Sequence, residues 1–178
     1  MTQGAPRLTG FAPVVAADAR LLLLGSFPGR ASLSAGQYYA HPRNQFWPLL
    51  GALLGRAIER LPYPERLRSV MAAGIAIWDV NASCVRAGSL DVAIRDASVN
   101  PFDELFALAP RLAAVGFNGA AAARHRARFE ALGLATYCLP SSSPAHASLR
   151  FEQKLQRWSA LRDDGWIAGP DGGQGEPR

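Results

Sequence analysis

Short apolar runs alternate with longer segments of helical periodicity along this chain. The runs predict strands buried on both faces, at residues 21–24, 75–80, 113–117 and 135–139. Apolar side chains at helical spacing predict helices at residues 46–54, 64–73, 101–110, 120–132 and 151–161. Strands that alternate with helices favour a parallel sheet covered on both faces. The pattern therefore predicts an α/β fold, a three-layer α/β/α sandwich around a central four-stranded, mainly parallel sheet.

The two ends of the chain differ in composition from its middle. Residues 1–9 are small and polar and predict a flexible arm, and residues 169–178 are rich in glycine and charge and predict a disordered tail. Residues 10–168 have the size of one ordinary domain, and the 49% hydrophobic content of the chain suffices for one core. We therefore expect a single folded domain.

Each predicted strand runs into a loop that contains polar or helix-breaking residues. The four loops are GSFPG (25–29), DVNAS (79–83), FNG (117–119) and PSSSPAH (140–146). Open parallel sheets bind ligands outside the carboxyl ends of their strands, so these loops should meet at one crevice. Side chains that suit a planar, polar ligand such as a nucleobase follow the first loop closely: Tyr38, Tyr39, His41, Arg43 and Asn44.

The charge of the chain favours a polyanionic partner. The formal net charge is +5, and Lys154 is the single lysine, so nearly all of the basic residues are arginine. Arginine forks onto phosphates and stacks on bases, which suits nucleic acid. A genome of high GC content would also enrich arginine, so composition alone leaves both interpretations open.

Several classes of site are disfavoured by what the sequence offers. Two cysteines, Cys84 and Cys138, are too few for a disulfide framework, so we expect a reduced, cytoplasmic protein. They are also too few for an iron–sulfur cluster or a zinc site, and the three histidines lie far apart in the sequence. We therefore expect no metal and no cofactor. No stretch has the length of a membrane helix, so no membrane association is expected. GSFPG lacks the Lys-Ser/Thr of a phosphate-binding loop, the nucleophile motif GxSxG is missing, and Asp79 is the one obvious acid in the loops.

Three motifs together resemble the uracil-DNA glycosylase superfamily: GSFPG at 25–29, AHPRNQFW at 40–47 and LPSSSPAH at 139–146. Mismatch-specific uracil glycosylases carry GINPG, followed at the same distance by AHPxNxFW, and thymine-DNA glycosylases carry PSSSA in the second motif. Where GINPG has a water-positioning asparagine, this chain has Phe27. A phenylalanine there, beside an intact HPRN, is similar to the hypoxanthine-DNA glycosylase branch, family 6.

The resemblance implies roles for individual residues. Asn44 matches the catalytic asparagine of that branch, Asn118 in FNG matches a second functional asparagine, and Tyr39 matches the aromatic residue that stacks on the base. We expect the base to be bound by Gly25, Ser26, Phe27, Tyr39 and Asn118. We expect DNA to be contacted by His41, Arg43, Ser141, Ser142, Ser143 and His146. His146 follows the serine motif where relatives place a residue that wedges into the duplex, although Pro144 alters this loop.

These residue types also make chemical sense for breaking a deoxyribosyl bond, which proceeds with oxocarbenium character. A neutral amide such as Asn44 can orient a water but cannot deprotonate it in the ground state. Stabilisation of the departing base must therefore supply much of the acceleration, through Asn118 and the backbone N–H of Phe27. The target base has to leave the stack, and the ring of Tyr39 would then sandwich it.

Each assignment has a structural alternative. Asn44 can simply cap the helix that begins near Phe46, Tyr39 can be a core ring with its hydroxyl at the surface, and Asn118-Gly119 is a common turn pair. His41 can bridge loops rather than contact substrate. Asp79 and Asn81 remain candidates for polar contacts at the edge of the pocket.

Taken together, the sequence predicts a monomeric DNA glycosylase that excises a deaminated base, with hypoxanthine first and uracil second. Lys154 is poorly placed to attack a sugar as an amine, so a monofunctional enzyme that leaves an abasic site is expected. Three alternatives stay open: a uracil or thymine-mismatch glycosylase, a damaged-DNA binder without catalysis, and an enzyme that acts on free nucleosides.

Overall fold

The computed structural model describes residues 6–168 and contains the predicted parallel sheet. Its strands have the order β3-β2-β6-β7 and are all parallel, with the bounds β2 Leu21–Gly25, β3 Ile75–Asp79, β6 Ala114–Asn118 and β7 Ala135–Leu139. Every residue of β2, β3 and β6 is buried, which explains why these strands are continuous apolar runs. The predicted fold class is confirmed.

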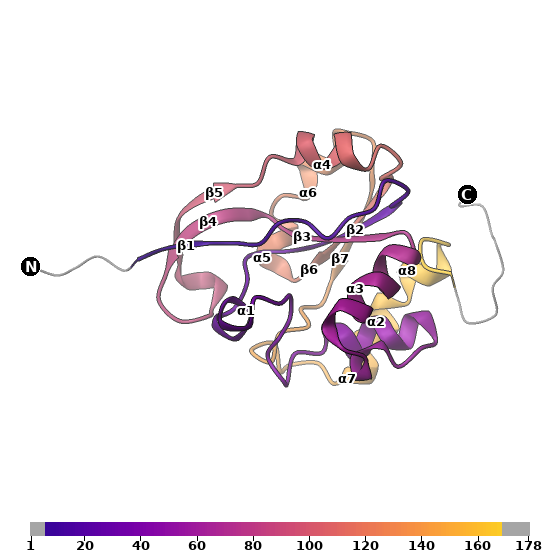
Figure 1. Ribbon diagram of the computed structural model, residues 1–178, viewed down its shortest axis with the longest axis horizontal. Coiled ribbons are helices and arrows are strands. Elements are labelled where there is room, and N and C mark those ends of the chain that lie inside the picture. The colour runs from indigo at the N-terminus through magenta and orange to yellow at the C-terminus, as the bar shows by residue number, and fades with distance from the viewer. Residues whose placement is uncertain (1–5, 169–178) are drawn as a thin grey trace, which may run out of the picture.

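Helices lie on both faces of this sheet (Figure 1). Their bounds are α1 Arg30–Ala35, α2 Phe46–Leu54, α3 Tyr63–Ala72, α4 Phe102–Leu108, α5 Ala120–Ala123, α6 Arg126–Glu130, α7 Phe151–Trp158 and α8 Ala160–Asp163, with 3₁₀ turns η1 Ile58–Arg60 and η2 Asp91–Ala93. In Figure 1, α4 and α6 lie on one side of the sheet, and α2, α3, α7 and α8 gather on the other. The three layers of the predicted sandwich are therefore present.

Aromatic side chains hold the helices to the sheet. On one side, Phe129 of α6 packs edge-on against Phe102 of α4, with ring centroids 5.0 Å apart, and against Phe117 of β6 at 5.5 Å. On the other, Phe46 of α2 meets Trp158 of α7 at 6.0 Å. Burial of each such ring stabilises the fold by about 1.5–3 kcal/mol. Because Phe46 is the first residue of α2, this packing also fixes the segment that precedes α2.

A second, antiparallel sheet was not predicted. It has the order β1-β4-β5, with β1 Arg7–Thr9, β4 Asn81–Arg86 and β5 Ile94–Val99. The expectation of a flexible arm over residues 1–9 is thus wrong for residues 7–9, because their backbone pairs with β4. Residues 1–5 and the predicted tail at 169–178 lie outside the described residues.

Two predicted helices differ from the structure. The segment 120–132 forms two short helices, α5 and α6, and the segment 151–161 forms α7 followed by α8. α1 was not predicted. The alanines of α5 offer no large apolar side chain to the core, whereas Phe129 of α6 is fully buried. Packing therefore anchors α6 more firmly than α5, and the segment does not form one long helix.

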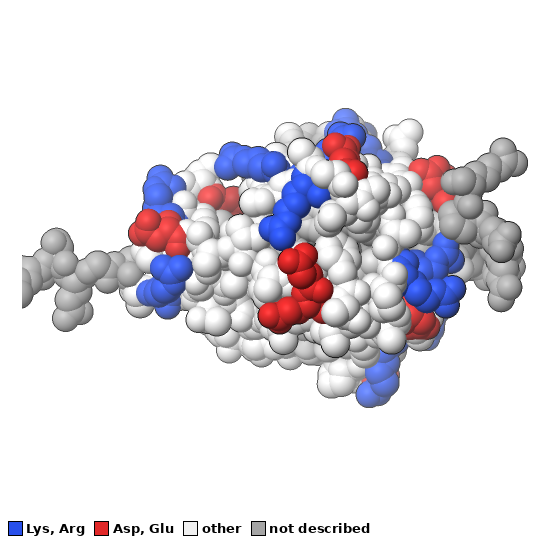
Figure 2. All heavy atoms as spheres, turned by 90° about the horizontal axis from the view of Figure 1, so that it is seen from above, with Lys and Arg blue, Asp and Glu red and all other residues white. Residues whose placement is uncertain are grey.

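The described part of the chain has charges of both signs on its surface. Figure 2 shows a face on which basic and acidic side chains alternate without one continuous basic area. Among residues 6–168, no helix is long and apolar enough to cross a membrane.

Candidate active site

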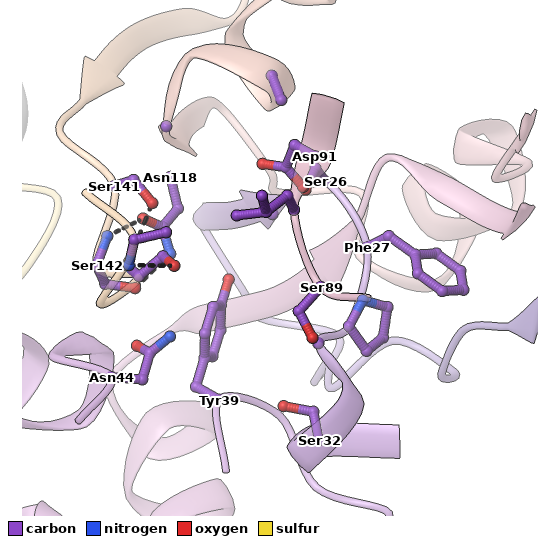
Figure 3. A pocket seen from close by; sticks show the side chains of 18 of the residues that line it. Ser26, Phe27, Ser32, Tyr39, Asn44, Ser89, Asp91, Asn118, Ser141 and Ser142 are labelled. Atoms are coloured by element: carbon purple, nitrogen blue, oxygen red, sulfur yellow. Dashed lines mark hydrogen bonds between the residues drawn. The ribbon is translucent and has the colours of Figure 1, made fainter. Parts of the chain in front are cut away.

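One cavity of about 450 Å³ lies at the carboxyl ends of β2, β3 and β6, where the predicted loops meet. Its volume is in the range of small-molecule sites. Apart from Arg43 and Asn81, the cavity brings together the residues that the sequence singles out: Gly25, Ser26, Phe27, Tyr38, Tyr39, His41, Asn44, Asp79, Asn118, Ser141, Ser142, Ser143 and His146. Arg43 is exposed and lies outside the lining. Figure 3 shows side chains from these separate segments around the same space.

Asn44 lines the cavity and also caps a helix. Its Oδ1 accepts a hydrogen bond of 2.9 Å from the backbone N–H of Phe46, the first residue of α2. This contact fixes the carboxamide and leaves a second lone pair on Oδ1 and both N–H groups of Nδ2. Capping and catalysis are therefore compatible, since the bond that anchors Asn44 leaves acceptor capacity for a water.

Asn118 and Ser142 are joined by two hydrogen bonds. Nδ2 of Asn118 donates to Oγ of Ser142 at 2.9 Å, and the backbone N–H of Ser142 donates to Oδ1 of Asn118 at 2.8 Å. The carbonyl of Ser142 accepts the N–H of Gln45 at 2.9 Å. Ser142, predicted to contact DNA, is instead fully buried and connects the loops that carry Asn118 and Asn44. Nδ2 of Asn118 has a second N–H that the bonds to Ser142 do not use.

Tyr39 offers the cavity one face of its ring at most. The other face stacks on Phe46, with centroids 3.8 Å apart and planes inclined by 13°. The backbone of Tyr39 has φ +54°, an uncommon value for a residue with a Cβ. The ring is half-buried while its hydroxyl oxygen is buried. Tyr39 can therefore stack on one side of a base but cannot complete a sandwich without a second platform.

The ring of Phe27 points away from the cavity (Figure 3). It lies 5.1 Å from the guanidinium carbon of Arg86, which also donates a hydrogen bond to the carbonyl of Pro28. Only the backbone of Phe27 is thus available to a ligand. Arg86 is buried beneath the loop 25–29 and holds it from below.

Asp79 occupies the end of β3, directly opposite Gly25 in the sheet. Its side chain is 4% exposed, and Oδ2 has no hydrogen-bond partner among the described residues. Burial raises the pKa of Asp79 to about 7, Asp91 acts in the same direction, and Arg86 opposes both. A buried polar atom without a hydrogen-bond partner lowers the free energy of unfolding by about 1–3 kcal/mol. A functional role for Asp79 would explain why the protein keeps this destabilising arrangement.

The hairpin between β4 and β5 forms a wall of the cavity that sequence reasoning missed. Ser89, Leu90, Asp91 and Val92 all line it, and Oγ of Ser26 donates a hydrogen bond to Asp91. Leu90 and Val92 are 54% and 74% exposed at this rim. No motif marks this hairpin, because its place beside the cavity depends on the unpredicted second sheet. Asp79, in contrast, could be recognised from the sequence, because it is an acidic residue at the end of a predicted buried strand.

Comparison with known proteins decides the family. Residues 12–162 match the family model described as Uracil DNA glycosylase superfamily. The chain belongs to the uracil-DNA glycosylase superfamily. The resemblance predicted from the three motifs is thereby confirmed.

Two relatives and one solved structure come from Methanosarcina species. A Methanosarcina barkeri protein named Hypoxanthine DNA glycosylase is 39% identical over 137 residues, which cover 77% of this chain and 87% of that protein. A protein of the same name from Methanosarcina acetivorans is 33% identical over 159 residues, covering 89% and 95%. A solution NMR structure from M. acetivorans, described as a candidate uracil DNA glycosylase, aligns with a TM-score of 0.80 at 31% identity and covers 89% of this chain and 98% of that one.

Proposed function

We propose that this protein is a monofunctional DNA glycosylase that removes hypoxanthine from DNA. The observation that carries the proposal is the convergence of two carboxamides, Asn44 and Asn118, with the ring of Tyr39 on one cavity. The two Methanosarcina relatives are named for the same activity. Uracil glycosylase activity, with Asn44 in the same role, is the second candidate and is favoured by the family model.

In the proposed reaction, Asn44 and Asn118 act at opposite ends of the glycosidic bond. The C1′–N9 bond breaks and its electron pair leaves with the base, while a water oxygen forms the new bond to C1′. In the balance, the water loses one proton and the base gains one. Asn44 orients the water through the free lone pair of Oδ1, and the second N–H of Asn118 donates to the departing base, where negative charge develops.

The base must be extruded from the duplex to enter the cavity. Exposed Arg30 and Arg124 line the cavity and can contact phosphates, and exposed Arg43 follows the lining residue His41 by two positions. His146 lies in the lining after the serine motif and is our candidate for the residue that wedges into the duplex. Stacking of the base on Tyr39 contributes about 1–3 kcal/mol.

The position of Lys154 supports the proposal that the enzyme is monofunctional. It lies on α7, is 2% exposed and does not line the cavity, so it cannot reach a sugar bound there. We propose that the enzyme leaves an abasic site and acts as a cytoplasmic monomer, with no resident metal or cofactor.

Release of free base from otherwise identical duplexes that contain inosine, uracil or xanthine tests the function. We expect the fastest single-turnover release from the inosine duplex. Faster release of uracil would favour the second candidate. Tight binding of the inosine duplex without release would instead indicate a damage binder, and equal rates on free deoxyinosine would indicate a nucleoside enzyme.

Gly25→Ala should lower base release by about 10–100-fold. A Cβ at Gly25 would meet the Asp79 carboxylate and lie 2.9 Å from the Tyr39 hydroxyl, and overpacking of this kind costs about 1–3 kcal/mol. Gly29→Ala is the matched control in the same loop, because its Cβ would have Ser89 Oγ at 3.8 Å as its nearest neighbour and its φ is −69°. Equal single-turnover rates for the two variants would contradict the packing argument.

A further inference from the structure

Two buried polar groups of the cavity have no hydrogen-bond partner among residues 6–168: Oδ2 of Asp79 and the hydroxyl of Tyr39. They come from different segments that meet at Gly25, where a Cβ would contact the other carboxylate oxygen of Asp79, Oδ1, and the Tyr39 hydroxyl. Folded proteins pair the great majority of buried polar side-chain atoms. Two unpaired groups side by side in a ligand-sized cavity therefore mark the place where a ligand completes the hydrogen bonding.

We infer that Asp79, as a neutral carboxylic acid beside the Tyr39 hydroxyl, binds the lactam edge of the extruded base. This inference rests on the proposed function. A neutral carboxyl has one O–H donor and one carbonyl acceptor. Hypoxanthine presents a C6 carbonyl beside N1–H, so Asp79 can donate to the former and accept from the latter.

The surroundings of Asp79 favour its neutral form. The pKa of Asp79 is raised to about 7, chiefly by burial and in smaller part by Asp91 of η2, with Arg86 of β4 acting in the opposite direction. Tyr38 and Tyr39, from the segment that precedes α2, face Asp79 as neutral phenols, because burial raises the pKa of both. A bound duplex excludes water and brings phosphate charge, and both effects disfavour an ionised carboxylate still more.

The protonation state of Asp79 then matters for the rate. Negative charge spreads onto the carbonyl oxygen of the base as the glycosidic bond breaks, so an O–H donor there binds more strongly in the transition state. An ionised Asp79 would offer no donor and would repel the same oxygen. Asp79 keeps its proton throughout, since it donates a hydrogen bond and transfers nothing.

The test is single-turnover release of free hypoxanthine from an inosine duplex between about pH 6 and pH 9. We expect the wild-type rate to fall by about tenfold for each unit above the pKa of Asp79 in the complex. Asp79→Asn retains a neutral donor and acceptor, so its rate should stay flat with pH and lie within about tenfold of wild type at low pH. The control Asp103→Asn, an exposed acid on α4 outside the lining, should follow the wild-type profile.

Three results would overturn the inference. A flat wild-type profile would show that no titration limits the rate, and a fall that persists in Asp79→Asn would assign the titration to a group other than Asp79. A wild-type enzyme that releases no base at any pH would overturn the proposed function and the inference with it. The first two results leave the proposed function standing, which keeps the two failures distinct.

Unfolding midpoints provide a readout that does not depend on activity. The pKa of Asp79 is higher in the folded than in the unfolded chain, so the folded state binds the extra proton between about pH 4 and pH 7. Wild type should therefore lose stability relative to Asp79→Asn as the pH rises through this window, and the difference should become constant above it. A difference that does not change with pH would contradict a buried neutral Asp79.

Discussion

Replacement of Asn44 by alanine is expected to lower single-turnover release of hypoxanthine by about 10³-fold. The carboxamide of Asn44 is held in place by the backbone N–H of Phe46 at 2.9 Å, so its remaining lone pair points in a fixed direction. Alanine removes the group that orients the attacking water and leaves the cavity otherwise intact. The affinity for the inosine duplex should stay close to that of wild type, because Asn44 acts on the water rather than on the base.

The helix cap is the competing explanation for any loss in this variant. Loss of a capping side chain costs about 1 kcal/mol of stability, which is too little to unfold a domain of this size. Asn44→Asp is the matched control, because a carboxylate still accepts the N–H of Phe46 and can still hold a water. We expect Asn44→Asp to release base much faster than Asn44→Ala. If Asn44→Ala were as active as wild type, Asn44 would have no catalytic role and would serve only to cap the helix.

Asn118→Ala should lower base release by about 10²–10³-fold. The substitution removes a donor to the departing base and breaks both hydrogen bonds to Ser142, of 2.9 and 2.8 Å. The loop that follows β7 would then lose its connection to the end of β6. Because the Ser142 carbonyl accepts the N–H of Gln45, a shift of this loop would also move the segment that carries Asn44. Rate and loop position should therefore both change.

Two further variants separate these effects. Ser142→Ala keeps the backbone N–H that donates to Asn118 and loses only the hydroxyl, so a modest loss of about tenfold is expected. Asn118→Asp keeps the acceptor for the Ser142 N–H but places negative charge where the base becomes negative, and should be as inactive as Asn118→Ala. If Asn118→Asp were nearly as active as wild type, leaving-group stabilisation by this residue would be refuted.

Much of the site could be predicted because it lies on the parallel sheet. Buried strands show as continuous apolar runs, and parallel strands place their carboxyl ends at one edge, so the loops with Gly25 and Asn118 had to meet. The register confirms this for Gly25 and Asp79, which are direct neighbours. Asn44 followed from its motif and from the start of α2 rather than from the sheet.

The remaining features depend on contacts that a local pattern does not encode. β1, β4 and β5 are short and partly exposed. β1 pairs with β4 over a long sequence separation, and the hairpin between β4 and β5 carries Leu90 and Asp91 to the cavity. The direction of the Phe27 ring is set by Arg86, which lies 59 positions further along the chain. The raised pKa of Asp79 arises chiefly from burial by several segments at once, which no motif can report.

A crystal structure of Asn44→Ala bound to a duplex with a single deoxyinosine would test the central claim most directly. We predict an extruded hypoxanthine in the cavity, with one face on the ring of Tyr39, its lactam edge against Asp79, and C1′ next to the position of the missing carboxamide. A hypoxanthine that stays stacked in the duplex, or that lies in the cavity with its C1′ remote from residue 44, would contradict the account.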